Sequence, residues 1–423
     1  MSVEHIDTLV VGGGQAGLAM SEHLGNNHVP HLILERERLA ERWRTARWDG
    51  LRANGPAWHD SFPSHDFAAM GGDAFPSKDE VVDYFETFAK KINAPIRCGV
   101  DVTRAYRLEG QSGFRVETSD GLIQANHLVC ATGPFQHPVI PPIVPNDAAI
   151  TQIHSNTYHR PQQLPDGAVL VVGSGSSGAQ IADELLRSGR EVYLSVGPHE
   201  RPPRQYRGRD FVWWLGVLGK WDAATPAPDT AHVTIAVSGA HGGYTVDFRR
   251  YAERGMTLLG MTSSYENGVL RFSPDLADNI NHGDASYLAM LDEADAYVSR
   301  NGLHLPEEPD ARNIGSDPLC ITQPLDQLNL ADAGITSIIW ATGYALDFSW
   351  LEVDAFGSDG QPNHQRGVSS EPGVYFVGLP WLSRRGSSFI WGVWHDAKFL
   401  ADHITTQHRY LDYHHAADDQ KKP

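Results

Sequence analysis

The sequence has few cysteines and lacks a long apolar run. Cys98, Cys130 and Cys320 are its only cysteines among 423 residues, and no two of them form a Cys-x-x-Cys pair. This spacing argues against a disulfide scaffold, a dithiol redox centre and a cysteine zinc site, and we expect no metal site. Neither a signal-peptide core nor an apolar span of about 18 residues is present. We therefore expect a cytoplasmic protein without a membrane partner.

Positive charge is also scarce. The chain has 34 Lys and Arg against 52 Asp and Glu, a formal net charge of −18. A broad attraction to nucleic acid is therefore not expected. The length exceeds what one hydrophobic core usually supports, so two or three domains are predicted. The 41 glycines and 26 prolines indicate a turn-rich globular chain.

What the sequence does contain is one glycine pattern twice, in "VVGGGQAG" and "VVGSGSSG". Each pattern follows a short apolar run (7–11 and 168–172), precedes a stretch with helical spacing, and is followed by a second strand-like run (31–37 and 191–196). This order predicts two βαβ units of the α/β class and gives the Gly-x-Gly-x-x-Gly pattern its meaning as a dinucleotide-binding loop. The candidate contacts are Gly12, Gly14, Gln15, Ala16 and Gly17 in the first loop, and Gly173, Gly175, Ser176, Ser177 and Gly178 in the second.

The residues after the second strand differ between the two units. Glu35 ends that strand in the first unit, where a carboxylate can accept hydrogen bonds from ribose hydroxyls. The corresponding residue of the second unit is Val196, and Arg201 and Arg204 follow it. Loss of the acid beside guanidinium groups favours a 2′-phosphate, hence NADPH over NADH. Alternatively, these arginines form a solvated face or pair with Glu200 and Asp210. The first loop is the better candidate for FAD.

Four further local features are predicted from composition and spacing. They are a helix over 76–92 with a Ser77–Glu80 capping box, a hairpin at Asp120-Gly121, a helix over 284–302 ending at Asn301-Gly302, and a frayed tail over 414–423. The proline-rich segment 134–145 is expected to cross between domains.

Six segments, in order and spacing, carry a resemblance to a known family. They are "GGGQAG" with Glu35, "ERWRTARWDGLRANGP" (41–56), "ATGPFQHPVIP" (131–141), "GSGSSG", "ATGY" (341–344) and "GVYFVGLPW" (373–381). Together they resemble the class B flavin-dependent monooxygenases, particularly bacterial relatives of flavin-containing, Baeyer–Villiger and N-hydroxylating monooxygenases. The resemblance implies two Rossmann-like domains, with an NAD(P)H-binding domain (156–319) inserted in an FAD-binding domain (1–155 and 320–423). The implied cofactors are FAD and NADPH, with NADH as an alternative.

The same resemblance assigns roles to single residues. Asn54 matches an asparagine near the flavin, where an uncharged amide can donate a hydrogen bond to a flavin C4a-hydroperoxide without supplying an acidic proton. The alternative is that Asn54-Gly55 is simply a turn. Arg36 and Trp43 resemble residues that lie against FAD, although Trp43 could equally be a core aromatic. Gly133 and Gly343 look like turns that approach the dinucleotides closely.

The implied reaction transfers one oxygen atom of O₂ to a small organic substrate. A fingerprint of the family is incomplete here: His154 and Tyr158 are present, but Ala148 and Ile150 replace the expected Phe and Gly. This favours oxidation of a soft sulfur or nitrogen, with Baeyer–Villiger oxidation of ketones or a non-oxygenating FAD/NAD(P)H redox sensor as alternatives. The oligomeric state stays open, including a homodimer. The tryptophan-rich segment 211–221 could be a lid or a partner surface. The aromatic residues of 381–394 could line an apolar substrate pocket or belong to the core.

Overall fold

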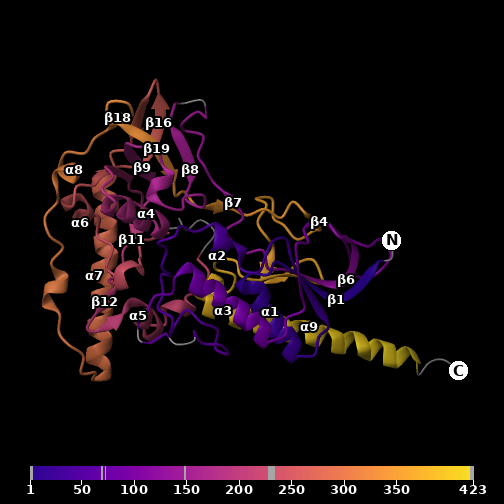
Figure 1. The fold of residues 1–423 in the computed structure, drawn as a ribbon. Helices are drawn as coiled ribbons and strands as arrows, with labels where there is room; N and C mark the ends of the chain where they lie inside the picture. The colour runs from indigo at the N-terminus through magenta and orange to yellow at the C-terminus, as the bar shows by residue number, and fades with distance from the viewer. Residues whose placement is uncertain (1–2, 68–69, 72, 147–148, 227–233, 420–423) are drawn as a thin grey trace.

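The computed structural model describes residues 3–67, 70–71, 73–146, 149–226 and 234–419. Figure 1 shows two α/β units beside each other. One contains the indigo N-terminal strands and the yellow C-terminal helix, and the other contains the segments from the middle of the chain. Both chain ends therefore belong to the same unit.

The first unit is built on a ten-stranded mixed sheet. Within it, β1 (Glu4–Val11) pairs in parallel with β2 (His31–Glu35) and with β6 (Gly121–Cys130), and the last four residues of β1 are buried. The other strands are β3 (Ile96–Cys98), β4 (Val102–Arg107), β5 (Phe114–Thr118), β21 (Leu351–Glu352), β22 (His364–Gln365), β23 (Val368–Ser369) and β24 (Val374–Phe376). The carboxyl end of β1 thus lies inside the sheet, at the start of the first glycine loop.

The second unit is built on a five-stranded sheet in which every pair is parallel. The strands run in the order β15 (Thr257–Leu259), β10 (Val192–Ser195), β9 (Ala168–Val172), β19 (Ile335–Trp340) and β8 (Thr151–His154). All five residues of β9 are buried, as expected for a strand covered on both faces. The second glycine loop therefore begins at the centre of this sheet.

The chain passes between the two sheets along neighbouring paths. The short strands β7 (His137–Pro138) and β20 (Tyr344–Ala345) pair antiparallel at this passage. The strands β8 and β19, which flank this passage, both belong to the second sheet. Both lie outside the segment 156–319 that was expected to form the second unit.

Each glycine loop opens a helix that leads to the next strand. α1 (Gln15–Asn26) joins β1 to β2 and α4 (Ser176–Arg187) joins β9 to β10, which confirms both predicted strand–helix–strand units. The other elements are α2 (Glu41–Thr45), α3 (Lys78–Lys91), α5 (Phe211–Val217), α6 (Phe248–Glu253), α7 (Leu276–Asn301), α8 (Leu319–Thr322), α9 (Ile390–Asp419), β11 (His199–Glu200), β12 (Gln205–Tyr206), β13 (Arg209–Asp210), β14 (Thr234–Ile235), β16 (Thr262–Glu266), β17 (Val269–Phe272) and β18 (Gln327–Asn329). No helix of the described part combines the length and apolarity needed to cross a bilayer.

The predicted capping box, hairpin and helix end are confirmed. Ser77 accepts a hydrogen bond from the Glu80 backbone at the start of α3, and the Glu80 side chain accepts one in return. Residues 118 and 121 face each other in the β5–β6 hairpin. α7 ends at Asn301, and Gly302 follows in the left-handed conformation, φ 60°.

Two helix limits were predicted wrongly. α7 begins at Leu276, before the expected residue 284, and α9 continues to Asp419, into the segment expected to be frayed. The preceding part of α9 packs with α1 and α3 in one hydrophobic core. A helix that is already docked adds one hydrogen bond for each further residue, which explains its extension without apolar periodicity.

The tight junction between β1 and α1 leads to a stability prediction. A Cβ on Gly17 would overlap the Gly12 carbonyl oxygen, whereas one on Gly25, in the same helix, would meet no atom within 4 Å. We expect Gly17→Ala to lower the free energy of unfolding by about 1–3 kcal/mol. We expect Gly25→Ala to raise it by about 0.5–1 kcal/mol. Urea unfolding followed by circular dichroism measures both, and an unaltered Gly17→Ala protein would contradict the close packing.

Candidate active site

The first glycine loop brings three chain segments together. Gly12 has φ +111°, and a Cβ there would lie 2.5 Å from the Ala131 carbonyl oxygen, so the end of β6 is pressed against the loop. Gly14 caps α1, and no side chain satisfies the first backbone N–H groups of that helix. The Glu35 carboxylate accepts a hydrogen bond from Gly13 N at 2.7 Å. The loop therefore combines free helix N–H groups with an acid at the end of β2.

The C-terminal segment covers the start of α1. Gln15 Nε2 donates a hydrogen bond to the Ser388 carbonyl at 2.7 Å. Gly378 has φ +81°, and a Cβ there would lie 2.6 Å from the Ala16 side chain. The segment following β24 thus lies directly on the first loop, a contact that only the family resemblance of "GVYFVGLPW" suggested.

Trp43 lies between the two units. It belongs to α2 and packs partly against a core cluster of each sheet. The Arg47 guanidinium lies 5.5 Å from the Trp43 ring centroid and 5.1 Å from that of Phe135. Arg36 is exposed beside Glu35, and Gly133 forms a turn with φ +71° after β6. Trp43 is therefore partly a core residue, as the alternative in the sequence analysis stated.

The second glycine loop repeats the geometry of the first. Gly173 has φ +108°, and a Cβ there would lie 2.5 Å from the Ala341 carbonyl oxygen. A Cβ on Gly178 would overlap the Gly173 carbonyl, as at Gly17 and Gly12. Both loops therefore join strand and helix by the same backbone contact.

A short strand that no sequence pattern predicted covers the second loop. A Cβ on Gly175 would lie 2.6 Å from Thr234 Oγ1, and Ser176 Oγ donates to the Ile235 carbonyl at 2.8 Å. Ser177, in contrast, is exposed. β14 thus lies over one side of the loop, and Ser177 marks the open side.

The Gly343 turn is held by a histidine of the incomplete fingerprint. His154 Nε2 lies 3.0 Å from the Gly343 carbonyl oxygen, which can only accept, so Nε2 carries the proton. His154 Nδ1 then accepts from the Asn156 backbone N–H at 3.2 Å. Burial lowers the pKa of His154, which keeps the ring neutral at pH 7. Ala148 lies outside the described residues.

Arg201 and Arg204 are engaged in buried ion pairs. Arg201 is 4% exposed and donates to Asp284 Oδ1 through Nε (2.9 Å) and Nη2 (2.6 Å). Arg204, 3% exposed, donates to both carboxylate oxygens of Asp210. The geometry thus favours the structural alternative for these arginines, although Arg201 pairs with Asp284 instead of Glu200. Neither guanidinium can contact a phosphate without giving up an internal carboxylate.

Asn54 lies where the two units meet. Gln180, on α4, donates from Nε2 to Asn54 Oδ1 (2.8 Å) and to the Val237 carbonyl (3.3 Å). Because that carbonyl only accepts, Gln180 presents its NH₂ group here and Asn54 must present its oxygen. Among the residues that the structure describes, none accepts a hydrogen bond from Asn54 Nδ2. The Asn54 amide is therefore oriented by the second unit with both its N–H donors available.

Arg204 and Asp60 support the backbone of the same turn. Arg204 Nη1 donates to the Asn54 carbonyl at 2.6 Å, and Gly55 N donates to Asp60 Oδ2 at 3.1 Å. A Cβ on Gly55 would lie 2.5 Å from the Asp60 carboxylate carbon, so a larger residue would displace that side chain. Asn54 and Gly55 thus lie in a bend of the chain, here called the Asn54 turn, whose backbone is held by Arg204 and Asp60.

The two tryptophan-rich segments meet beside this turn. The His59 ring is stacked on Trp221 at 5.1 Å between centroids and meets Trp391 edge-on at 5.3 Å. Trp221 also contacts Phe389 at 5.2 Å, and Phe389 is 38% exposed. We name Trp221, Trp391, Phe389 and His59 the aromatic cluster.

Other tryptophans of the same segments have structural roles. Trp214 is fully buried, with its indole N–H on the Tyr206 carbonyl at 3.0 Å. Trp394 donates to Glu22 on α1 at 2.6 Å. These side chains serve packing and do not belong to the aromatic cluster.

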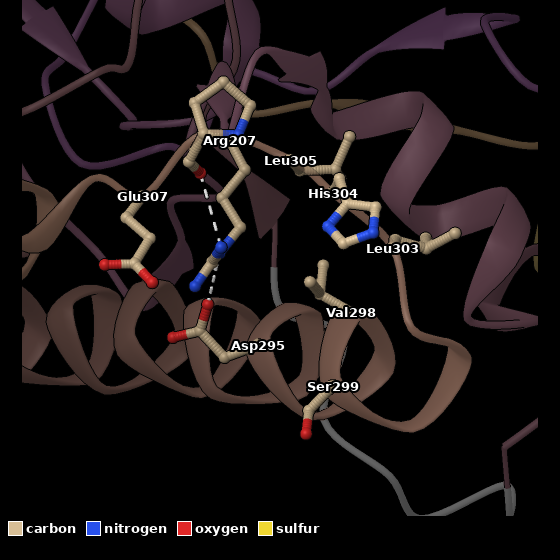
Figure 2. A pocket seen from close by; sticks show the side chains of 9 residues that line it. Arg207, Asp295, Val298, Ser299, Leu303, His304, Leu305 and Glu307 are labelled. Atoms are coloured by element: carbon tan, nitrogen blue, oxygen red, sulfur yellow. Dashed lines mark hydrogen bonds and ion pairs between the residues drawn. The ribbon is translucent and has the colours of Figure 1, made fainter.

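A cavity of about 610 Å³ lies elsewhere. Figure 2 shows its lining on α7 and the segment 303–307, with Arg207 bonded to Asp295. None of its lining residues belongs to a glycine loop or to the Asn54 turn. This cavity is therefore separate from the candidate active site.

Comparisons with known proteins agree with the geometry. A family model described as pyridine nucleotide-disulphide oxidoreductase matches residues 9–209. An uncharacterized CzcO-like oxidoreductase of Geobacillus kaustophilus is 34% identical over 95% of this chain and 99% of its own length. A probable indole-3-pyruvate monooxygenase of Arabidopsis thaliana, YUCCA4, is 27% identical over 94% of this chain and 90% of its own length.

Solved structures share the fold. A flavin-containing monooxygenase from Stenotrophomonas maltophilia superimposes with a TM-score of 0.66 and 18% identity, over 96% of this chain and 99% of that one. The Geobacillus relative is similar to this chain over nearly the full length of both proteins, which goes beyond a shared fold. The chain therefore belongs to the same oxidoreductase family as its CzcO-like relatives.

Proposed function

We propose that this chain is an FAD-dependent NAD(P)H monooxygenase that transfers one oxygen atom of O₂ to a soft sulfur or nitrogen of a small organic substrate. The supporting observation is the Asn54 amide. It belongs to the first unit, its oxygen is held by Gln180 of the second unit, and no residue in the described part of the chain accepts from its N–H donors. An oriented donor at the junction of two dinucleotide loops is what the reaction of two cofactors requires.

The first loop fits the pyrophosphate of FAD. No protein atom lies within 4 Å of a Cβ built on Gly14, and the first N–H groups of α1 have no side-chain cap. Glu35 would exchange its bond to Gly13 N for ribose hydroxyls. Gln15, Ala16, Gly17, Arg36, Trp43 and Gly133 complete the proposed FAD contacts.

The second loop is assigned to the nicotinamide dinucleotide. Gly173, Gly175, Ser176, Ser177, Gly178 and Gly343 are its proposed contacts, and NADPH is the proposed donor with NADH as the alternative. The two sheets then correspond to two Rossmann-like domains, the second inserted in the first. Because β8 and β19 belong to the second sheet, we set the domain boundaries at the paired strands β7 and β20.

The bound flavin would accept a hydride from the nicotinamide and activate O₂. The part of this chain is to orient one donor and to exclude water. An amide at residue 54 donates a hydrogen bond but has no proton to release at pH 7, whereas a carboxylic acid there would supply one. The aromatic cluster brings apolar rings to the chain segment that follows this amide, and its Phe389 is 38% exposed, which suits an apolar substrate.

The cysteines argue against a disulfide reductase of similar fold. Cys98, Cys130 and Cys320 are all unpaired thiols in the part of the chain that the structure describes. Cys130 is buried, which raises its pKa and suppresses the thiolate. No paired dithiol is therefore available beside the first loop.

The open space around Gly14 predicts that a side chain there affects FAD affinity but not the stability of the fold. We expect Gly14→Ala to weaken FAD binding at least tenfold, because the added methyl group occupies the path of the pyrophosphate. The unfolding free energy of the FAD-free protein should stay within about 0.5 kcal/mol of that of the unsubstituted chain, since no protein atom is displaced. Fluorescence titration with FAD measures the affinity, with Gly25→Ala as the matched control. Unchanged FAD affinity would count against the assignment.

The orientation of the Asn54 amide leads to a prediction about the fraction of oxidised NADPH that ends as hydrogen peroxide. We expect Asn54→Asp to increase the hydrogen peroxide released per NADPH oxidised, because a carboxyl group can supply a proton. Gln180→Leu should cause a smaller increase, because the Asn54 amide loses its orientation but keeps its chemistry. Both are measured by oxygen-electrode assays beside thioether, amine and ketone substrates.

Product analysis under ¹⁸O₂ separates the alternatives. Label in a sulfoxide or N-oxide supports the proposal, and label in an ester supports Baeyer–Villiger oxidation instead. If every substrate of the panel stays unlabelled while all NADPH electrons appear as peroxide, the chain is a redox-sensing flavoprotein and the proposed function is refuted.

Because Arg201 and Arg204 are engaged in buried ion pairs, we expect the preference between NADPH and NADH to depend on other side chains. We expect Arg201→Ala to lower the unfolding free energy by about 3–5 kcal/mol, because it leaves the Asp284 carboxylate with one cation fewer. The ratio of kcat/KM for NADPH to that for NADH should stay within about twofold, which is below 0.5 kcal/mol. Arg201→Lys retains the charge and is the control for folding. A tenfold loss of NADPH preference in a folded variant would restore Arg201 as a phosphate ligand.

A further inference from the structure

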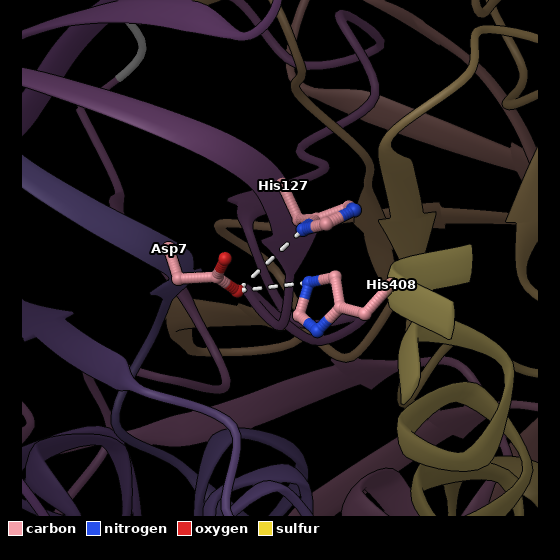
Figure 3. Close-up of side chains that lie close together, drawn as sticks. All are labelled: Asp7, His127 and His408. Atoms are coloured by element: carbon pink, nitrogen blue, oxygen red, sulfur yellow. Dashed lines mark ion pairs between the residues drawn. The ribbon is translucent and has the colours of Figure 1, made fainter. Parts of the chain in front are cut away.

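Three side chains from distant parts of the chain converge beside the first sheet, away from both glycine loops. They are Asp7 on β1, His127 on β6 and His408 on α9. Figure 3 shows the Asp7 carboxylate facing both imidazole rings. Asp7 Oδ1 lies 3.7 Å from His127 Nδ1 and 3.3 Å from His408 Nε2, and the three atoms lie within 4.8 Å of one another.

The two imidazole nitrogens that face Asp7 have no hydrogen bond. His127 Nδ1 and His408 Nε2 are both inaccessible to solvent and unpartnered, and the His127 side chain is only 8% exposed. A buried polar atom without a partner costs about 1–3 kcal/mol. Both atoms face the same carboxylate oxygen at ion-pair distance but without a hydrogen bond, and an ion between the three atoms would satisfy both nitrogens at once.

The separations fit a metal ion. Tetrahedral Zn²⁺ binds imidazole nitrogen at about 2.0–2.1 Å and carboxylate oxygen at about 2.0–2.2 Å, so neighbouring ligand atoms lie about 3.3–3.5 Å apart. The observed 3.3 and 3.7 Å are close to these values. The two imidazole nitrogens lie within 4.8 Å of each other, so binding would draw them closer together.

The surroundings of Asp7 hold it in the orientation that a ligand needs. Thr8 Oγ1 donates to Asp7 Oδ1 at 2.9 Å, and Asn126 Nδ2 donates to Asp7 Oδ2 at 3.3 Å. Oδ1 keeps a second lone pair for an ion. Hydrogen bonds of this kind to a ligating carboxylate are typical of metal sites in proteins.

We propose that Asp7, His127 and His408 bind one divalent transition-metal ion of the Zn²⁺ class. Two imidazoles and one carboxylate suit zinc, cobalt or nickel, whereas magnesium and calcium prefer oxygen ligands. A water molecule supplies the fourth ligand. The ion joins β1, β6 and α9, and so fastens the C-terminal helix to the first sheet.

No local ligand spacing in the sequence indicates this site, and no metal site was expected. The three ligands lie near the start, in the first third and near the end of the chain, and only the packing of α9 brings them together. The proposal is independent of the monooxygenase assignment, because it uses none of the residues of the glycine loops or of the Asn54 turn.

The test measures zinc binding by the full-length FAD-bound protein, freed of any affinity tag and stripped with a chelator. Calorimetric titration with ZnCl₂, followed by metal analysis after gel filtration, should give one equivalent of zinc. We expect Asp7→Asn and His408→Gln each to raise the Kd at least tenfold. The His408 side chain is partly exposed on its helix, so His408→Gln can still be tested if a change at the buried His127 prevents folding.

His137→Gln is the matched control. His137 pairs with Asp347 at 2.9 Å on the surface, a histidine–carboxylate pair without a second histidine, and its loss should leave zinc affinity unchanged. Co²⁺ should add absorption to the red of the flavin bands in the unsubstituted and His137→Gln proteins only. The proposal is overturned if the unsubstituted protein retains no zinc, or if Asp7→Asn and His408→Gln bind it as tightly as the control does.

Discussion

In the first turn of α1, Gly17 lies so close to the carbonyl of Gly12, the residue after β1, that no side-chain carbon fits between them, and Gly178 has the same relation to Gly173. Because this contact holds the first turn of the helix against its strand, the free N–H groups of α1 and α4 are directed into their loops. The connecting segments, the candidate catalytic turn and the covering C-terminal segment are all arranged around these two junctions.

The two junctions are coupled through one amide pair. Gln180 follows the second loop on α4, and its NH₂ group bridges Asn54 and the Val237 carbonyl. Arg204 reaches the Asn54 backbone from the same unit while its charge is balanced by Asp210. Removing Arg204 or Asp210 would leave the other charge buried without its partner, and it would also loosen the contact that supports the Asn54 backbone. The positions of Gln180 and Arg204 in the second unit therefore influence the position of a donor in the first.

Features that depend on residues close together along the chain could be predicted from the sequence. The glycine loops, the capping box at Ser77 and the stop at Gly302 are local patterns, and each was found from spacing. Gln180 could have been suspected only from its place two residues after Gly178, because its partner Asn54 is far away in sequence. The Arg201–Asp284 pair and the strand β14 over the second loop depend on tertiary packing, which no local spacing encodes.

α9 is the element that connects the first loop to the Asp7–His127–His408 cluster. Its start follows Ser388, whose carbonyl binds Gln15, and His408 lies on the same helix. At about 1.5 Å per residue, His408 is roughly 27 Å along the helix axis from Ile390. An ion bound there is too distant to act on a substrate near Asn54. Its influence on the reaction would have to pass through the position of α9, and therefore through the aromatic cluster that Trp391 joins.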